Sequence, residues 1–397
     1  MIPRRKAYTY PGESADLEEW CRAASDRDPQ TIAQWEKAVA DFVGVPHAAA
    51  VNSGRRGMTL VFKHLGIGSD DEVIVPAYTL KDLIPLIQNL GARVVPADID
   101  PETLNVTAET VAGRITPKTK AILALHAFGS PCSIEAIVGV AEPRGIPVVE
   151  DCAHSLGASV HGRQTGSFGC AGFFSFEMTK PINTFGGGMV VSSDQRLIDG
   201  IHQETANDVL DLSPLRKKIG ATRTEEKLFA WGLAFPMLYF LSSPRWKGLV
   251  SRIYRRFRHA PPENIRYTSI QAELGLRKLP GLPERLRERR AKVELFRSLL
   301  APEIRTQRVE VGCESTWYFL VAILPCPAAE ARRRMLYRGV DAAVEDEIVD
   351  NCAALLGYGD CPVVTDIYRR AMALPLYDGI SDEAIRKTAR VVNKVVS

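Results

Sequence analysis

Residues 148–180 read VVEDCAHSLGASVHGRQTGSFGCAGFFSFEMTK. This segment contains the end of one short apolar run and the whole of a second, and each run carries a polar side chain at or near its end. The first run, IPVVED (146–151), ends in Asp151, and the second, AGFFSF (171–176), carries Ser175 near its end. Their Val, Ile and Phe content without strict alternation is typical of strands covered on both faces. Because open α/β sheets bind ligands beyond the carboxyl ends of their strands, Asp151 and Ser175 are candidate site residues.

The same pattern continues on both sides of this segment. Further apolar runs are EVIVPA (72–77), ARVVPAD (92–98), KAILALHA (120–127) and GGMVVSS (187–193). Helical stretches lie between several of them, for example 79–90 and 133–144, and TIAQWEKAVADFVG (31–44) has the apolar period of a helix that stops at Gly44. This alternation predicts an α/β fold with a mostly parallel, doubly wound sheet.

The chain has 397 residues, which is beyond the usual range for one core. Its character changes after about residue 200, where helical, charged segments and one probable strand replace the alternation. We expect a large domain over 1–265, including the N-terminal segment and an apolar and basic helical insertion at about 205–260. A smaller α+β domain is expected over 266–397.

Composition excludes several classes of function. A formal net charge of +3 is too small to argue for a nucleic-acid partner. The eight cysteines are scattered, none forms a C-x-x-C pair and no histidine cluster adjoins them, so neither a metal site nor a disulfide scaffold is expected. The N-terminal stretch lacks an apolar segment behind its basic residues and is not a secretory signal. A cytoplasmic location is the expectation.

Lys180 stands five residues after Ser175 and just before the glycine triplet at 186–188. A lysine is a nucleophile only when neutral, and a site that lowers its pKa lets it form a Schiff base. The glycines permit positive φ or a close backbone approach. A surface lysine in an ordinary loop accounts for the position about equally well.

Two other segments could serve the same ligand. In VNSGRRGMTLVFKHLG (51–66), Ser53-Gly54 precede a helix whose first amides could bind a phosphate, with charge added by Arg55 and Arg56. The alternative is an ordinary serine N-cap. Asp151 could pair with a protonated ring nitrogen, with His154 nearby, or it could simply cap the turn after its strand.

Taken in order, these segments resemble the DegT/StrS family of sugar aminotransferases, fold type I enzymes that depend on pyridoxal 5'-phosphate (PLP). The resemblance covers about residues 32–280. It rests on VNSGRRGM, DDEVIVPAYTL, GARVVPADIDPETLNVTAETVAGRITPKTKAILALHAFGSP, the segment quoted first, and ENIRYTSIQAELGLRKL (263–279).

The resemblance implies a role for each matching residue. Lys180 matches the lysine that binds the cofactor aldehyde and later moves the proton, and Asp151 matches the carboxylate on the pyridine nitrogen. His154 stands where the family usually has Gln, next to the phenolic oxygen. The residues implied to hold the phosphate are Ser175, Ser53, Gly54 and Arg55. Asn264 matches a residue that reaches the phosphate of the neighbouring subunit, which implies a homodimer with shared sites.

Besides His154, the sequence departs from the family pattern at three further positions. Arg55 replaces the usual Thr of the phosphate turn, and Gly186 replaces an acidic residue. Leu80 stands where many members stack an aromatic ring on PLP, and Tyr78 is an alternative for that role. His126, in ALHAFGS, is expected to be a hydrogen-bonded core histidine.

The segment 228–259 allows two interpretations. An apolar run of 14 residues, 228–241, is short of the ~20 that span a bilayer, and 245–259 is basic and amphipathic. An interfacial helix pair on the inner membrane surface would give access to a lipid-linked substrate. The alternative is a helical cap buried against the dimer partner.

The expected activity is therefore amino transfer with glutamate as donor. The expected acceptor is a nucleotide-linked keto-sugar or a related ketone. Family members that dehydrate keto-sugars carry His in place of the lysine, and Lys180 argues against that reaction. A PLP-binding regulatory or scaffold protein without turnover is the alternative outside enzymes.

Overall fold

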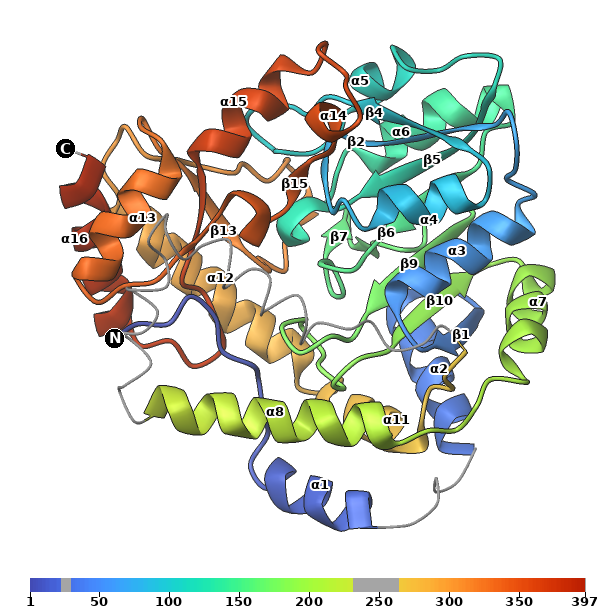
Figure 1. Cartoon of the computed structure of the whole chain (residues 1–397), viewed down its shortest axis with the longest axis horizontal. Helices are drawn as coiled ribbons and strands as arrows, with labels where there is room; N and C mark the ends of the chain where they lie inside the picture. The colour runs from blue at the N-terminus through green and yellow to red at the C-terminus, as the bar shows by residue number, and fades with distance from the viewer. Residues whose placement is uncertain (23–29, 231–263, 397) are drawn as a thin grey trace.

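The computed structural model describes residues 1–22, 30–230 and 264–396 (Figure 1). Its main sheet has seven strands in the order β1-β10-β9-β6-β5-β2-β4. Strands β9, β6, β5, β2 and β4 are mutually parallel, whereas β10 runs antiparallel to β9 and β1. The bounds are His47–Val51 (β1), Glu72–Pro76 (β2), Arg93–Ala97 (β4), Thr119–Leu125 (β5), Val148–Asp151 (β6), Ala171–Ser175 (β9) and Gly188–Ser192 (β10). The prediction of a mostly parallel α/β sheet is confirmed.

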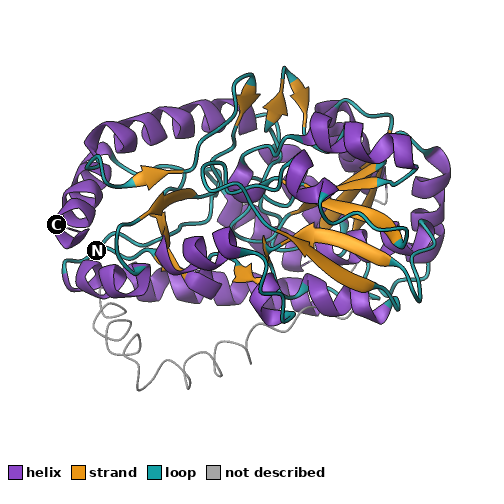
Figure 2. Cartoon of the chain, turned by 90° about the horizontal axis from the view of Figure 1, so that it is seen from above, coloured by secondary structure: helices purple, strands orange, loops and turns teal. Residues whose placement is uncertain are grey.

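Helices cover both faces of this sheet, as the strand composition requires (Figure 2). On β2, Val73 and Val75 belong to a core layer with helices α3, α4 and α7, while Ile74 lies in the layer with α5 and α6. Alternate residues of each strand therefore enter different apolar layers, which explains the continuous apolar runs. The helices are Gln30–Val43 (α2), Gly54–His64 (α3), Leu83–Asn89 (α4), Ala108–Ala112 (α5), Ile134–Ala141 (α6), Gln195–Thr205 (α7) and Ser213–Ala230 (α8).

The C-terminal part has a second sheet of four strands in the order β11-β13-β16-β14. Its strands are Arg305–Thr306 (β11), Leu320–Ile323 (β13), Ala343–Val344 (β14) and Ala371–Leu374 (β16). Its helices are Leu282–Leu299 (α12), Ala328–Tyr337 (α13), Cys352–Leu355 (α14), Pro362–Arg370 (α15) and Asp382–Val396 (α16). Two smaller sheets consist of short strands. One pairs β3 (Tyr78–Thr79) with β15 (Asp350–Asn351). In the other, β7 (Ser159–Val160) pairs with both β8 (Arg163–Gln164) and β12 (Cys313–Glu314).

The N-terminal segment and helix α11 each connect to one of these sheets. Ile2 pairs with Val340 beside the second sheet, and α1 (Glu13–Arg22) follows (Figure 1). Helix α11 (Ser269–Lys278), capped by Thr268, packs against α2 of the first sheet's core. The division at 265/266 stays a prediction.

Of the segment 228–259, most lies outside the described residues, so neither interpretation of it is tested. Its beginning belongs to α8. Among the residues that the structure describes, no helix is long and apolar enough to cross a membrane.

Candidate active site

Asp151 lies at the carboxyl end of β6, between the ends of β5 and β9. The parallel register sets Leu125 and Phe173 beside it. Its residue is only 5% exposed, and its Oδ1 accepts the backbone N–H of Ala153 at 3.0 Å. Burial raises the pKa of this carboxyl group, while the Ala153 amide and the charge of Lys180 act in the opposite direction.

Lys180 follows β9 after a short turn in which its own amide bonds the carbonyl of Glu177 at 2.9 Å. Its Nζ lies 4.5 Å from the centroid of the Tyr318 ring. Its charge acts on both Asp151 and His154. The structure therefore brings the predicted lysine, carboxylate and histidine together at one end of the sheet.

His154 is held in an aromatic stack. Its ring lies parallel to that of Tyr318, with centroids 4.2 Å apart and planes 16° apart, and near-parallel to Phe128 at 6.4 Å. Burial, and then the charge of Lys180, keeps the pKa of His154 well below its ordinary value, so the ring is neutral at pH 7. Its Nδ1 is buried and has no hydrogen-bond partner in the described part of the chain.

Ser53, Gly54 and Ser175 form a close backbone arrangement. Ser53 pairs with Gly187, and Gly188 lies opposite Ser175 in the β9–β10 ladder. A Cβ at Gly54 would lie 3.1 Å from the carbonyl oxygen of Phe174 and 3.3 Å from the Cβ of Ser175. Glycine therefore lets the start of α3 approach the end of β9 closely.

Ser53 can serve as the N-cap of α3 and still belong to a phosphate-binding turn. Its Oγ caps α3 by accepting the amide of Arg56 at 3.2 Å. The amides of Gly54 and Arg55 precede it in the first helical turn, which offers no carbonyl partner within the helix. An anion could bind these amides while the serine cap remains in place.

These residues fit PLP on three observations of the chain itself. The charge of a lysine amine acts on a buried carboxylate at the same end of the sheet. A buried imidazole nitrogen lacks a partner. A helix start approaches the end of β9 at Gly54, in space that any Cβ would crowd. Bound there, the phosphate would lie on the first turn of α3 with Ser175, and the ring between Asp151 and Lys180.

The side chains of three predicted residues lie apart from this group. The Arg55 guanidinium is engaged by Asp82, with Nη1 and Oδ2 3.0 Å apart, so its amide rather than its charge faces the cradle. Leu80 is 39% exposed. Asn264 is exposed, and its carbonyl accepts the amide of Val209 at 2.8 Å. Their roles stay predictions.

Tyr78, the alternative for ring stacking, is buried and packs edge-on against Phe128 at 5.7 Å. It therefore supports the rings behind His154. No contact places it beside Lys180.

Sequence reasoning missed Tyr318 and Thr179. The Tyr318 hydroxyl bonds Thr179 Oγ1 at 2.8 Å, and Thr316, two residues before it, donates to the carbonyl of His154 at 2.7 Å. Tyr318 comes from the segment before β13, more than 130 residues beyond Lys180. The aromatic run TWYF is visible in the sequence, but nothing there indicates which strand end it covers.

His126, Glu150 and Cys152 form a buried cluster whose potential ligand atoms lie within 4.8 Å of one another. Glu150 is already saturated, because it accepts His126 Nε2 at 3.0 Å and the amides of Gly166, Phe168 and Gly169 at 2.7–2.8 Å. The cluster is thus a hydrogen-bonded network, and the prediction that His126 is a bonded core histidine is confirmed.

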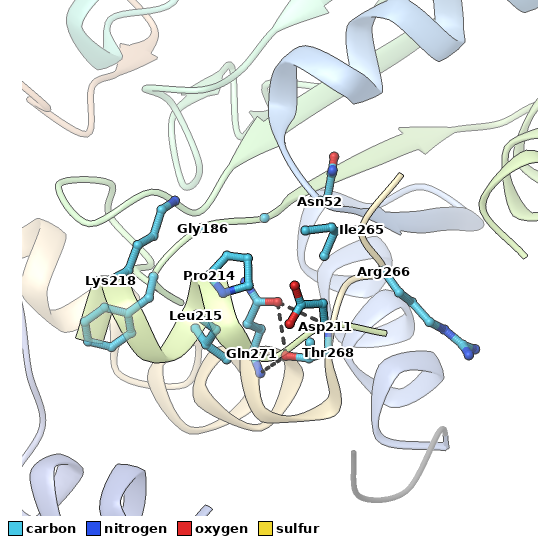
Figure 3. A pocket seen from close by; sticks show the side chains of 12 residues that line it. Asn52, Gly186, Asp211, Pro214, Leu215, Lys218, Ile265, Arg266, Thr268 and Gln271 are labelled. Atoms are coloured by element: carbon cyan, nitrogen blue, oxygen red, sulfur yellow. Dashed lines mark hydrogen bonds between the residues drawn. The ribbon is translucent and has the colours of Figure 1, made fainter. Parts of the chain in front are cut away.

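A separate pocket opens beside the glycine turn (Figure 3). Neither Lys180 nor Asp151 lines it. Lys218, whose Nζ bonds Glu177 Oε1 at 2.6 Å, reaches toward Gly186, while Arg266 extends outward. The lining residues are Asn52, Phe185, Gly186, Gly187, Asp211, Pro214, Leu215, Lys218, Ile265, Arg266, Thr268 and Gln271. Because Ser53 pairs with Gly187, this pocket adjoins the candidate phosphate cradle.

The neutral state of His154 predicts a pH-dependent stability. Its folded pKa lies below the ordinary 6.5, so the unfolded chain binds a proton more readily once the pH falls below about 6.5. Wild-type protein without cofactor should therefore lose up to about 1.4 kcal/mol of unfolding free energy per pH unit relative to His154→Gln. Urea titrations at pH 7.5 and 5.5 measure this difference. An equal change in unfolding free energy between the two pH values for wild type and His154→Gln would contradict it.

Comparison with known proteins adds a family match. The model of the DegT/DnrJ/EryC1/StrS aminotransferase family matches residues 13–396. The spore coat polysaccharide biosynthesis protein SpsC of Bacillus subtilis is 30% identical over 383 residues, which cover 92% of this chain and 89% of SpsC. GDP-perosamine synthase of Caulobacter vibrioides is 32% identical over 270 residues, covering 68% of this chain and 62% of that enzyme.

A solved structure has the same fold over its whole length. The aminotransferase TlmJ from Streptoalloteichus hindustanus superposes with a TM-score of 0.79 at 25% sequence identity. The superposition covers 100% of this chain and 98% of TlmJ.

Proposed function

Since this chain belongs to the DegT/DnrJ/EryC1/StrS aminotransferase family and is a PLP-dependent transaminase, we propose that it carries an amino group from glutamate to a nucleotide-linked keto-sugar. One observation carries the chemistry. The Lys180 amine shares one end of the sheet with a buried carboxylate, Asp151, and a neutral imidazole, His154. Amine, carboxylate and neutral donor are the groups that such amino transfer requires of the protein.

Each side chain has a distinct task in this proposal. PLP supplies the electron sink for the carbanion formed at the amino-bearing carbon. Asp151, buried and hydrogen-bonded, keeps a proton on the ring nitrogen. Lys180 Nζ removes and returns the substrate proton, and the Tyr318 ring beside it limits the access of water. His154, held in its stack, would offer a neutral imidazole to the phenolic oxygen of the bound cofactor.

The sugar acceptor is supported by the relatives. Two of them are named for spore coat polysaccharide biosynthesis and for GDP-perosamine synthesis.

The working unit is proposed to be a homodimer. Asn264 is exposed, and we assign its side chain to the site of a neighbouring subunit. A solution mass of a single 43.7 kDa chain would contradict this part of the proposal.

The function is tested by two half-reactions. With glutamate alone, the visible absorbance of the lysine-bound cofactor should disappear as the amino form accumulates. Adding GDP-, UDP- or dTDP-linked 4-keto-sugars should restore it for one nucleotide class. If no amino acid of a panel changes the spectrum, the scaffold alternative is favoured. If free keto acids restore the band and none of the nucleotide-linked keto-sugars does, the sugar acceptor is contradicted.

A further inference from the structure

The turn that follows Lys180 is held by a buried lysine from another element. Lys278, at the end of α11, has a fully buried side chain. Its Nζ donates to the carbonyl of Asn183 at 2.8 Å and to Glu13 Oε1 at 2.9 Å, and it lies 3.5 Å from the carbonyl of Tyr8. All three ammonium protons therefore face an acceptor, and one acceptor lies three residues from Lys180.

A second buried cation holds the same turn. Arg285 Nη1 donates to the carbonyl of Pro181 at 3.0 Å and to Asp378 Oδ2 at 2.8 Å. Its guanidinium also lies over the ring of Tyr8, 3.8 Å from the centroid. Two carbonyls of the segment directly after Lys180 are thus fixed by side chains from α11 and α12.

The counter-charge of Lys278 is itself immobilised. Glu13 begins α1, and its second oxygen accepts the amide of Tyr10 at 3.0 Å. Further along α1, Leu17 and Trp20 share a core cluster with Phe185 of the glycine turn. The N-terminal segment therefore contacts the Lys180 turn through its charge and through its apolar face.

Stability alone does not explain a charge at this position. Burying an ion pair costs desolvation energy, and apolar side chains of similar volume are often as stabilising or more so. The apolar residues of the same helix, Ile270 and Leu274, show that this environment accepts them. An apolar side chain at 278, however, could not donate to the carbonyl of Asn183.

We propose that Lys278, with Glu13 as its fixed counter-charge, is a positioning residue that holds the turn carrying Lys180 through the carbonyl of Asn183. The proposal rests on the proposed function for its catalytic consequence. The positional claim itself concerns the protein without cofactor. It predicts that removing the ammonium loosens residues 182–186. Within this segment the amides of Thr184 and Gly186 bond the carbonyl of Phe176, and the amide of Phe185 bonds Asn183 Oδ1.

The test separates position from stability. Lys278→Met leaves the buried Glu13 carboxylate without its counter-charge and should lower Tm, whereas Lys278→Met/Glu13→Gln removes both charges and should regain most of that Tm. Both variants should show at least about tenfold faster amide hydrogen exchange at 182–186 without cofactor, and at least about tenfold lower kcat. Arg277→Met is the matched control. It removes the neighbouring exposed ion pair to Asp16, and should change neither quantity more than about twofold.

Two outcomes would overturn the proposal. If exchange and kcat of the double variant return to wild-type values together with Tm, the pair is purely structural. If exchange rises while kcat is unchanged, the turn's position does not matter for turnover. Should wild-type protein prove inactive, the proposed function fails, and the exchange measurement alone decides whether Lys278 holds the turn.

Discussion

Lys180→Ala should abolish turnover, by at least about 10⁴-fold, because the variant lacks both the amine that binds the cofactor and the base that moves the proton. The side chain is only half-buried, so its truncation opens no core cavity and the fold should persist. The visible absorbance of the lysine-bound cofactor should vanish as well. Both losses are read in a single sample by spectroscopy and by amino-transfer assay.

A small added amine, such as methylamine, should restore part of the activity in Lys180→Ala, since it can occupy the vacated space and carry the proton. Lys63→Ala is the control, because Lys63 lies on the surface of α3 and pairs with Glu204. Lys180→Ala protein that keeps the visible band and appreciable turnover would refute the assignment of the nucleophile.

Asp151→Asn should reduce kcat by about 10³-fold, equivalent to about 4 kcal/mol of transition-state stabilisation. An amide keeps the shape of the side chain and the bond to Ala153, but it cannot keep a proton on a ring nitrogen by charge. The cofactor should still bind, because the lysine and the phosphate cradle are unchanged. Steady-state kinetics with saturating cofactor measure the loss.

Stability provides the control for Asp151→Asn. Because burial raises the folded pKa of Asp151 above 3.8, the carboxyl group is most favourable to folding at low pH and becomes less so as the pH rises past that value. A neutral amide has no such penalty, so the variant without cofactor should be at least as stable as wild type at pH 7. A variant with lower Tm and proportionally lower activity would indicate misfolding instead of lost chemistry.

Most of the first sheet could be predicted because its strands are buried on both faces and each contains a short apolar run with Val, Ile or Phe. Strand β1 escaped prediction for the opposite reason. Its sequence HAAAV is rich in alanine, which has little strand preference, and only its pairing with β10 makes it a strand. The strand conformation of β1 therefore depends on its tertiary contacts with β10.

In the site, too, some residues follow from local sequence and others depend on tertiary contacts. Asp151 and Ser175 end strands, so their common location follows from parallel topology alone. Tyr318, Lys278 and Arg285 reach the Lys180 turn from segments about 100 residues or more away in the chain, and no local pattern encodes such contacts. Arg55 illustrates the reverse case, since its place in the turn was expected but its pairing with Asp82 was not.

The hydrogen bonds of Ile2 with Gly339 and Asp341 have a consequence for biosynthesis. Ribosomes add about 5–20 residues per second, so roughly 17–70 seconds separate the emergence of these two partners. During that interval the leading segment cannot complete its native contacts, although the residues of the sheet around Asp151 are already synthesised. The contacts of Ile2 therefore form only after every strand of the first sheet has been synthesised.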